Sequence, residues 1–598
     1  MSSRKEGSFG LLKAEAQCLK KDGVCVAAVR RGATLCLQGC AQVRVLTGVM
    51  EVNGFLLKQE TGFRALYSPS NCSHLTLTAL DANPHVEGSA GFPMSPELAG
   101  GSSRFYPASQ ATQPNEVRVD LEPVDAERLN AMIAAGGWRD VAVVMLLKAT
   151  DSALTRCLEA QDGVLPSFKH SLIPGFQMLD SVSTHALTFT RNAYQLASDV
   201  MAFSHQSGPV VVVSGVSGSG KSTLCRFLVN YLLNRHPAVG YLECDVGQTE
   251  FTVPGVCALH VVREPLLGPP YTHPQKASRA YYYGGKTPKD QPGLYGRITA
   301  ALFEHFMADV RKSSPHMPLI VNSCGWLTDL GVPIFLELLQ TVRPTHLVKL
   351  EQDVPEGDGT NQTIPVWDDA SASGSHPDFI GSGIGLRGSS SGLHDDQYEP
   401  IVYCLQPHLR HTKNSKMMRK LAYVAYFSPI YSSALDMAPH LEHTMNIGRS
   451  FLLLAPPKSV SWSSVAVHVL HRKVPSSQLL YALNGRFVAL GCVEEEEIVS
   501  HESRYPGMVK TLHSQLPLVK FIGLGLLRGI DMESKHFYIT TPEDSESLTR
   551  VNVLVLDQAE DPDNIVSRKD FPINNMVPVP YHSAEFISCD IGQYCWKP

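Results

Sequence analysis

The stretch Gly215-Val216-Ser217-Gly218-Ser219-Gly220-Lys221-Ser222 decides how the rest of this sequence is interpreted. It satisfies every fixed position of the phosphate-binding pattern G-x-x-x-x-G-K-[ST]. A β-branched run at residues 209–214 precedes it, and apolar residues at helical spacing follow it, so we predict a buried strand, the loop and a helix in that order. The helix N-terminus then faces the phosphates. The sequence therefore predicts a nucleoside triphosphate site.

Each residue type in this site has a distinct expected role. The predicted nucleotide-binding set is Gly215, Val216, Ser217, Gly218, Ser219, Gly220, Lys221, Ser222 and Thr223. The glycines let the backbone curl around the phosphates without Cβ clashes. Lys221 is expected to reach the β- and γ-phosphates, and the Ser222 hydroxyl is expected to ligate Mg²⁺. We thus expect ATP and Mg²⁺ as the cofactors.

A second predicted strand, residues 239–245, ends in the carboxylate of Asp245. A carboxylate at the tip of a neighbouring strand can hold Mg²⁺ through water or accept a proton from an attacking hydroxyl. The next segment, residues 246–255, combines a glycine turn, polar side chains and a proline, which favours a substrate loop that includes Gln248. An ordinary connection with a surface carboxylate is the alternative.

Motifs that the sequence lacks narrow the class of protein. It contains no N/T-K-x-D motif of GTPases, no L-S-G-G-Q signature of transporters and no D-E-x-D/H strand of helicases. Metabolite kinases, nucleic-acid kinases and ATP-driven switches remain. A third predicted strand, residues 318–323, is followed by Cys324-Gly325-Trp326, which would put an aromatic ring at the mouth of a cleft. Such a ring suits a nucleobase, although a Trp packed in the core fits the same pattern.

These motifs together resemble the polynucleotide 5′-hydroxyl kinases, a family that includes the cleavage-factor RNA kinase and its nucleolar relative. The resemblance rests on the phosphate loop, on Asp245-Val246-Gly247-Gln248-Thr249-Glu250-Phe251-Thr252 and on Asn322-Ser323-Cys324-Gly325-Trp326. Residues 282–288 are similar to the family's aromatic-glycine-[ST]-proline segment. The G-Q-T-E-F-T sequence is most like the nucleolar member, which is implicated in ribosomal RNA processing. The resemblance is strong over residues 208–350 and weaker on both flanks.

The resemblance implies transfer of the γ-phosphoryl group of ATP to the 5′-hydroxyl of RNA, with DNA as an open alternative. In such a mechanism Lys221 holds the phosphates and Asp245 orients or deprotonates the 5′-hydroxyl. Asp245 would also hold Mg²⁺ through water, beside Ser222. Gln248, Asn322 and Trp326 would position the terminal nucleotide.

A basic segment, residues 408–420, precedes a predicted apolar helix, and residues 408–427 are the expected lid. In the family a basic lid closes over the triphosphate and its arginines stabilise charge on the transferring group. Arg410, Lys416 and Arg419 are the candidates here, and Arg419 is the favoured catalytic residue. Lysine replaces some of the family's arginines here. Because lysine lacks the bidentate guanidinium group, the identity of the two lid cations stays open. A solvated basic helix face is the alternative.

Length and composition agree with an intracellular enzyme of several domains. The chain has 598 residues and 43% apolar residues, and no run approaches the ~20 apolar residues that span a membrane. The N-terminus lacks the apolar region of a secretory signal. Fourteen scattered cysteines predict reduced thiols rather than disulfides or a zinc site. The net charge of −6 argues against a broad nucleic-acid-coating surface, though a local basic groove remains compatible.

We predict an α/β protein with a central parallel phosphate-loop sheet flanked by two β-rich modules. Residues 1–180 form the N-terminal β-rich module, residues 181–440 the kinase domain and residues 441–598 the C-terminal β-rich module. A helix is expected at residues 187–204, a disordered insertion at residues 352–397, and a first C-terminal strand at residues 451–454.

The expected place and partners follow from the resemblance to the nucleolar member. They are the nucleus, specifically the nucleolus, and the 5′-hydroxyl ends of a ribosomal RNA precursor cut by an endonuclease partner. The C-terminal β-rich module is the candidate docking surface for that partner, and no membrane is expected. Two alternatives stay open. One is a small-metabolite kinase, disfavoured by the flanking modules, and the other is a non-catalytic ATP-binding scaffold of an RNA-processing complex.

Overall fold

The computed structural model describes most of the chain, with gaps. The described residues are 9–13, 16–21, 24–80, 131, 140–161, 163–165, 175–179, 185–205, 207–350, 400–405, 414–437, 451–452, 455–471, 474–475, 478–500 and 509–556. Spatial contacts divide the chain into two compact units. Unit 1 comprises residues 1–198, 226–235 and 264–272, and unit 2 comprises residues 199–225, 236–263 and 273–598.

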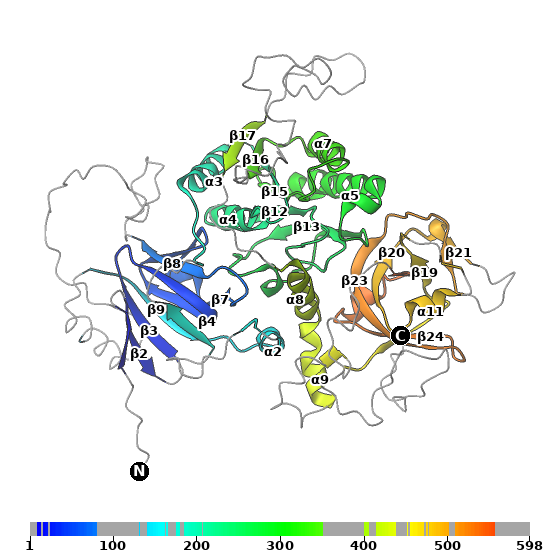
Figure 1. Cartoon of the computed structure of the whole chain (residues 1–598), viewed down its shortest axis with the longest axis horizontal. Helices are drawn as coiled ribbons and strands as arrows, with labels where there is room; N and C mark the ends of the chain where they lie inside the picture. Colours follow the sequence, from blue (N-terminus) through cyan, green and yellow to red (C-terminus); the bar gives the residue numbers. More distant parts are fainter. Residues whose placement is uncertain are drawn as a thin grey trace, which may run out of the picture. The chain divides into compact units, whose positions relative to one another are not determined.

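Unit 1 is built on a largely antiparallel sheet, drawn mostly in blue in Figure 1. Its strands are β1 (Phe9–Lys13), β2 (Ala16–Lys21), β3 (Val24–Arg30), β4 (Thr34–Thr47), β5 (Val49–Val52), β6 (Phe55–Leu57), β7 (Arg64–Ser68), β8 (Leu75–Leu80), β9 (Val141–Ala149) and β10 (Phe176–Leu179). The path through the sheet is β1-β2-β3-β9-β4-β8-β5-β6, and β7 and β10 also pair with β4. A short helix, α2 (Ala153–Glu159), follows β9.

The sequence pattern of this unit matches what its strands bury. In β8 buried side chains alternate with half-buried ones over most of the strand, the period-two pattern of a sheet with one covered face. Gly48 joins β4 to β5 with φ +81°, and a Cβ there would lie 2.0 Å from the Ala142 carbonyl oxygen. Only glycine fits that turn. The predicted N-terminal β-rich module is confirmed.

Unit 2 contains one long mixed sheet. Its strands between residues 210 and 405 are β11 (Val210–Gly215), β12 (Val239–Glu243), β13 (Val256–Val262), β14 (Arg279–Tyr282), β15 (Leu319–Asn322), β16 (His346–Leu350) and β17 (Ile401–Leu405). The path runs β17-β16-β11-β15-β12-β13-β14 and continues as β23-β20-β25-β19. Pairing is parallel from β17 to β12 and antiparallel from β12 to β14. The carboxyl ends of the parallel strands therefore meet at one edge of the sheet.

The C-terminal strands extend this same sheet. They are β18 (Lys458–Ser461), β19 (Ala466–Val469), β20 (Phe487–Cys492), β23 (Lys520–Asp531), β24 (His536–Thr540) and β25 (Val553–Leu556), with a separate small pair, β21 (Ile498–Val499) and β22 (Thr511–Leu512). The junction is Tyr281 of β14 opposite Lys520 of β23. The α/β sheet with β-rich modules on both sides is thus confirmed.

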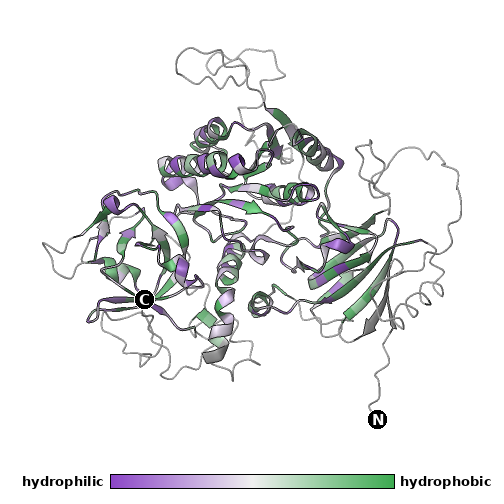
Figure 2. Cartoon of the chain, turned by 180° about the vertical axis from the view of Figure 1, so that it is seen from behind, coloured by the Kyte–Doolittle hydropathy of each residue, from purple (hydrophilic) through white to green (hydrophobic). Residues whose placement is uncertain are grey.

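The principal helices of unit 2 cover its sheet or carry its site. They are α5 (Pro292–His305), α7 (Gly331–Val342), α8 (Ser415–Phe427) and α9 (Tyr431–Met437). Two further helices, α3 (Arg191–Phe203) and α4 (Lys221–Leu233), each have residues in both units. Figure 2 shows largely hydrophobic strands beside helices that mix hydrophobic and hydrophilic residues. That mixture is typical of helices that bury one face.

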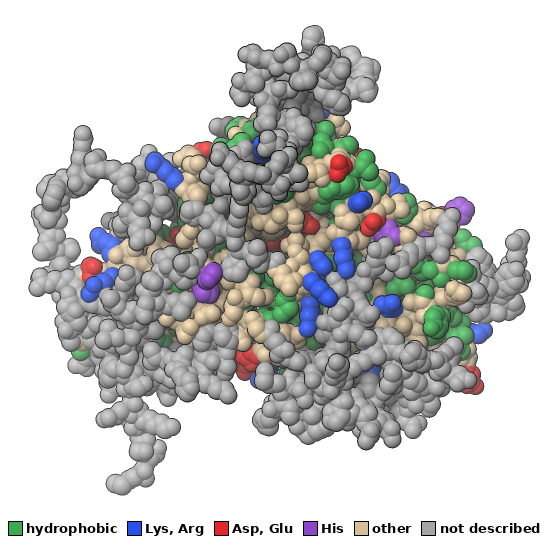
Figure 3. All heavy atoms as spheres, in the orientation of Figure 1, with side chains coloured by type: hydrophobic (Ala, Val, Ile, Leu, Met, Phe, Trp, Pro, Cys, Tyr) green, Lys and Arg blue, Asp and Glu red, His purple; other side chains and the backbone are tan. Residues whose placement is uncertain are grey.

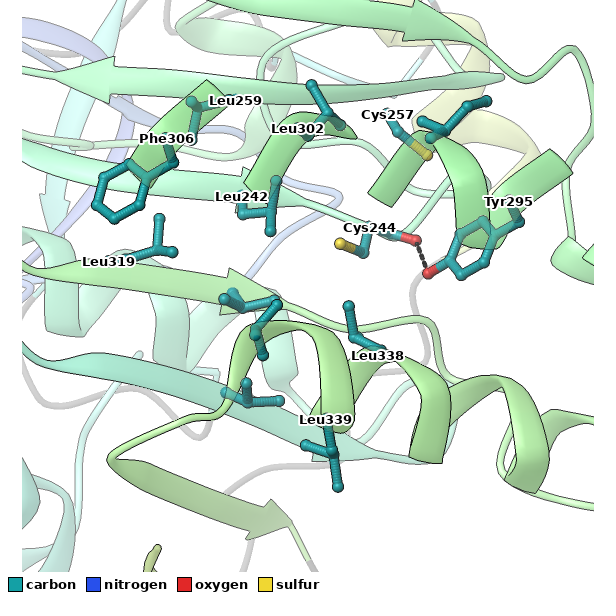
Figure 4. Close-up of a cluster of buried hydrophobic side chains, with 14 of the residues drawn as sticks. Leu242, Cys244, Cys257, Leu259, Tyr295, Leu302, Phe306, Leu319, Leu338 and Leu339 are labelled. Carbon is teal, nitrogen blue, oxygen red and sulfur yellow. Dashed lines mark hydrogen bonds between the residues drawn. The ribbon is translucent and has the colours of Figure 1, made fainter. Parts of the chain in front are cut away.

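The core of the kinase sheet lies between its parallel strands and the helices α5 and α7. In Figure 4, Leu319 of β15 lies beside Phe306, and Leu242 of β12 belongs to the same cluster as Leu302 of α5 and Leu338 of α7. These side chains are at most 3% exposed, and full burial of one such side chain contributes about 1.5–3 kcal/mol. The helices therefore fix the sheet edge on which the site is built.

Some expectations need correction. Phe451 and Leu452 are helical, whereas a strand was expected at residues 451–454; periodicity alone cannot separate so short an apolar run from a buried helical turn. The helix expected at residues 187–204 begins at Arg191. Cys25 is disulfide-bonded, so the prediction of reduced thiols is wrong for that residue. Among the described residues ten cysteines are free, and they include Cys36 and Cys324.

Other expectations fall outside the described part of the chain. The insertion at residues 352–397 lies there, as does the lid candidate Arg410. The three-domain division stays a prediction. Among the described residues, no helix is long and apolar enough to cross a membrane.

Candidate active site

The phosphate loop lies between β11 and α4, as its sequence predicted. Gly218 and Gly220 have φ angles of 80° and 95°, in the left-handed region that favours glycine. A Cβ on Gly215 would lie 2.6 Å from the Ser219 Oγ. The loop is closed by a bond from the Ser219 N–H to the Val216 carbonyl, 3.2 Å long. This geometry leaves the first turn of α4 at the mouth of the loop.

Lys221 folds back onto the loop that it would serve. Its Nζ donates to the Gly215 carbonyl at 2.9 Å and to the Val216 carbonyl at 3.0 Å, and the residue is 5% exposed. Burial lowers the pKa of Lys221, and the nearby charge of Asp245 opposes that shift. The ammonium is therefore held by the loop carbonyls, where a phosphate would compete for it.

Asp245 lies two residues after the end of β12 and caps a tight turn. Its Oδ1 accepts from the backbone N–H groups of Gly247 and Gln248, both at 3.1 Å. Burial raises the pKa of Asp245, while the charge of Lys221 and these two N–H bonds lower it. The carboxylate is thus fixed by its own turn, near enough to Lys221 for each charge to influence the pKa of the other.

The strand end that carries Asp245 is held from two sides. The Tyr295 hydroxyl of α5 donates to the Cys244 carbonyl at 2.8 Å, the dashed line in Figure 4. The Cys244 N–H donates to the Asn322 carbonyl at 3.1 Å. Because α5 and β15 both pin this backbone, the position of the Asp245 carboxylate is set by the rigid core.

The segment after β15 packs directly against the phosphate loop. A Cβ on Gly325 would lie 2.9 Å from both the Lys221 Nζ and the Ser217 backbone nitrogen. Glycine at this position is therefore required for the close approach. Burial and the charge of Asp245 raise the pKa of the neighbouring Cys324 to about 11, so its thiol stays protonated near neutral pH.

Asn322, a predicted substrate residue, bonds to the phosphate loop and to the neighbouring strand β12. It is fully buried, and its Nδ2 donates to the Ser222 Oγ at 3.3 Å and to the Glu243 Oε1 at 3.2 Å. Its substrate role stays a prediction. Sequence reasoning missed Glu243, although an acidic residue inside the apolar run Tyr-Leu-Glu-Cys-Asp was a visible signal.

The remaining substrate candidates lie beside these groups. The Gln248 Nε2 donates to the Ser415 Oγ of α8 at 3.3 Å. Trp326 is partly buried and packs against the kinase core, and a Cβ on Gly331 would lie 3.0 Å from its Cδ2. Because Trp326 is only partly buried, a substrate role and a packing role both stay predictions.

The lid candidates lie on the first turns of α8. The Asn414 side chain caps this helix by accepting from the backbone N–H groups of Lys416 and Met417 at 3.1 and 3.2 Å. Lys416 is exposed and Arg419 is half-buried. Figure 3 shows Lys and Arg side chains gathered over the region that α8 occupies in Figure 1. Their catalytic role stays a prediction.

Three family models match separate parts of the chain. Residues 215–364 match the "mRNA cleavage and polyadenylation factor CLP1 P-loop". Residues 13–92 match the "Polynucleotide 5'-hydroxyl-kinase NOL9, N-terminal domain", and residues 454–562 match the "NOL9-like, C-terminal domain". These matches cover the β-rich module of unit 1, the phosphate-loop sheet and the C-terminal module.

Curated relatives named polynucleotide 5′-hydroxyl-kinase NOL9 match over long stretches. The human protein is 31% identical over 58% of this chain and 49% of its own length. The mouse protein is 29% identical over 67% of this chain and 55% of its own length, and the zebrafish protein (Danio rerio) is 27% identical over 91% and 72%. The chain thus spans about half the length of the mammalian relatives in these two alignments.

A solved structure supports the fold independently. The complex of Clp1p with Pcf11p has a chain that aligns with a TM-score of 0.51 and 11% identity, over 90% of this chain and 98% of that one. At such low identity the likeness concerns the fold alone. With the three family matches and the NOL9 relatives, the resemblance to the polynucleotide 5′-hydroxyl kinases that was drawn from the motifs is confirmed.

Proposed function

We propose that this chain is an ATP-dependent kinase that phosphorylates the 5′-hydroxyl of RNA. The observation that carries the proposal is convergence at one edge of the sheet. The phosphate-loop Lys221, the turn-capping Asp245 and the Gly325 segment come from three adjacent strands and meet there. A nucleotide site and a carboxylate for the acceptor hydroxyl are the two parts that phosphoryl transfer needs.

The residues can perform the transfer as follows. The 5′-hydroxyl oxygen attacks the γ-phosphorus of ATP, the bond from that phosphorus to the β-bridging oxygen breaks, and ADP leaves. Asp245 accepts the hydroxyl proton, and a carboxylate with a raised pKa is better suited to hold it. Lys221 leaves the loop carbonyls for the phosphates and stabilises their charge. Arg419 and Lys416 of α8 are the lid cations.

The oxygen donors at this edge fit Mg²⁺. The Ser222 hydroxyl and the Asp245 carboxylate, the latter through water, are ligands of the kind that this ion prefers. When bound, the ion neutralises charge on the β- and γ-phosphates. We propose Ser222 as the direct ligand.

We further propose that the natural substrate is a ribosomal RNA precursor end in the nucleolus. The support is the NOL9 name of the relatives and the G-Q-T-E-F-T sequence after Asp245. An endonuclease partner would dock on the C-terminal module, where Tyr481 is 78% and Met532 46% exposed. Depletion of the protein should then leave precursor fragments with 5′-hydroxyl ends; unchanged 5′-phosphate ends would contradict this assignment.

The experiment that tests the activity uses γ-labelled ATP with three acceptors. These are 5′-hydroxyl oligoribonucleotides, oligodeoxyribonucleotides and free nucleosides. We expect label on the oligoribonucleotide ends and loss of that label on treatment with a 5′-phosphatase. Label on nucleosides alone would favour the metabolite kinase, and ATP binding without transfer to any acceptor would favour the scaffold.

A further inference from the structure

The backbone of Asn322 lies between the strand that leads into the phosphate loop and the strand that carries Glu243. It ends β15, and its register partners are Val213 on β11 and Glu243 on β12. Glu243 and Asn322 are both fully buried. The strand pairing therefore puts the residue that carries this amide between the strand of the phosphate loop and Glu243 of β12.

Neighbouring groups fix which way the Asn322 amide faces. Its Nδ2 donates to the Glu243 Oε1 at 3.2 Å, and its Oδ1 accepts from the Cys225 Sγ at 3.9 Å. The other Glu243 oxygen, Oε2, accepts the backbone N–H of Glu250. Because both carboxyl oxygens of Glu243 serve as acceptors, the NH₂ group of Asn322 is the end that must face Glu243.

The second hydrogen of that NH₂ group reaches Ser222. The Nδ2 to Oγ distance is 3.3 Å, so Asn322 occupies one lone pair of the hydroxyl. A serine hydroxyl has two lone pairs and one hydrogen. The remaining lone pair and the hydrogen then point away from Asn322, which suits a metal ion and a phosphate oxygen respectively.

We propose that Glu243 and Asn322 form a positioning pair that holds the Ser222 hydroxyl ready to bind Mg²⁺ with the nucleotide. Glu243 contacts neither nucleotide nor metal in this scheme; it acts through Asn322. The role rests on the proposed function, because it assumes that Ser222 is the metal ligand. Metal ligands generally depend on such outer partners for their orientation.

The test substitutes Glu243→Gln in the full chain. Glutamine replaces one of the two carboxyl oxygens with an NH₂ group, so the Glu250 N–H and the Asn322 amide no longer each have an acceptor oxygen, and the Asn322 amide loses its fixed orientation. The readout is ATP affinity by calorimetry, measured once with Mg²⁺ and once with EDTA. We expect the affinity with Mg²⁺ to fall about three- to tenfold, the worth of one hydrogen bond, and the affinity in EDTA to stay within twofold.

A matched control and a double-mutant cycle separate positioning from simple structural damage. Glu250→Gln is the control, since the Glu250 side chain bonds His273 and its backbone N–H is retained. It should leave both affinities unchanged. In a Ser222→Ala background, Glu243→Gln should have no further effect on the affinity with Mg²⁺, because the hydroxyl that it positions is gone. Asn322→Ala replaces Glu243→Gln in the same cycle if the latter fails to fold.

Two results would overturn the proposal. One is an equal loss of ATP affinity with and without Mg²⁺, and the other is additive losses in the Ser222→Ala cycle. Neither readout requires phosphoryl transfer. If the variants show the coupling between Glu243 and Ser222 but the wild-type chain never labels RNA, only the proposed function is refuted. If the wild-type chain labels RNA but the variants show no such coupling, only the positioning role of Glu243 and Asn322 is refuted.

Discussion

At the phosphate loop, one cation and one carboxylate share a poorly solvated space, and their roles can be separated by substitution. Asp245→Asn keeps the side-chain oxygen that accepts from Gly247 and Gln248, so the turn should survive. It removes the group that takes the hydroxyl proton. We expect ATP affinity within a few-fold of wild type and transfer to RNA lost by a factor of at least about a hundred, measured by binding and single-turnover kinetics.

Lys221→Ala is the comparison for that experiment. It removes a charge that contacts the phosphates, so transfer should fall on the order of a thousandfold. ATP affinity should fall as well, in contrast to Asp245→Asn. Full activity of the Asn variant would remove Asp245 from the mechanism, whatever Lys221→Ala does.

The partial burial of Trp326 is compatible with contact to a nucleobase and with packing in the core, and a single variant distinguishes the two roles. If the ring stacks on a nucleobase, Trp326→Ala should weaken RNA binding by about 1–3 kcal/mol and leave ATP affinity unchanged. The same variant would lower the melting temperature and both affinities if the ring mainly packs on the kinase core. Melting curves beside the two affinities decide between these outcomes.

Sequence reasoning found the residues that belong to contiguous motifs and missed the contact that depends on the pairing of two strands distant in the sequence. The loop and Asp245 belong to contiguous motifs, so their chemistry is written in a few adjacent positions. Asn322 was assigned to the substrate, and Glu243 was not assigned at all. Their bond depends on the register of β12 against β15, which no single segment encodes.

Among the elements, α8 connects the substrate loop to the C-terminal module. Ser415 at its start accepts from Gln248. Near its end the Tyr426 hydroxyl donates to Glu543 at 2.7 Å and accepts from the Leu524 N–H at 2.7 Å. The predicted apolar helix was correct, but these anchors were invisible in sequence because they join residues about a hundred positions apart.

Tyr426→Phe tests whether this anchor holds the lid residues in place. It leaves the Glu543 carboxylate and the Leu524 N–H without the hydroxyl, at a cost of about 1–3 kcal/mol of unfolding free energy. We expect a lower melting temperature together with a reduced kcat for RNA phosphorylation, because α8 carries Lys416 and Arg419.

Tyr403→Phe is the matched control for that variant. Its hydroxyl also donates to a carboxylate, Asp199, at 2.9 Å, but it lies on the edge strand β17. We expect it to lower stability without changing kcat. An equal effect of the two variants on kcat would show that α8 anchoring has no special link to the chemistry.

At the scale of the whole chain, the kinase sheet and the C-terminal module share one compact unit. The Tyr282 N–H donates to the Val519 carbonyl at 2.9 Å, and the Tyr282 and Phe521 rings stack 5.8 Å apart. His471 approaches the Tyr283 carbonyl at 2.9 Å. The sequence predicted a separate C-terminal module, and its strands were largely correct. The continuity of the sheet escaped prediction because it rests on one non-local pairing.

This continuity predicts that the kinase will not survive removal of the C-terminal module. A chain that ends at residue 445 would expose Tyr282, now 1% exposed, and would leave the edge of β14 unpaired. We expect such a chain to aggregate or to melt well below the full chain, with no ATP-dependent rise in melting temperature. A chain that ends at Leu556 keeps every described strand and serves as the control. A soluble 1–445 fragment that phosphorylates RNA at the full-length rate would show instead that the shared sheet is dispensable.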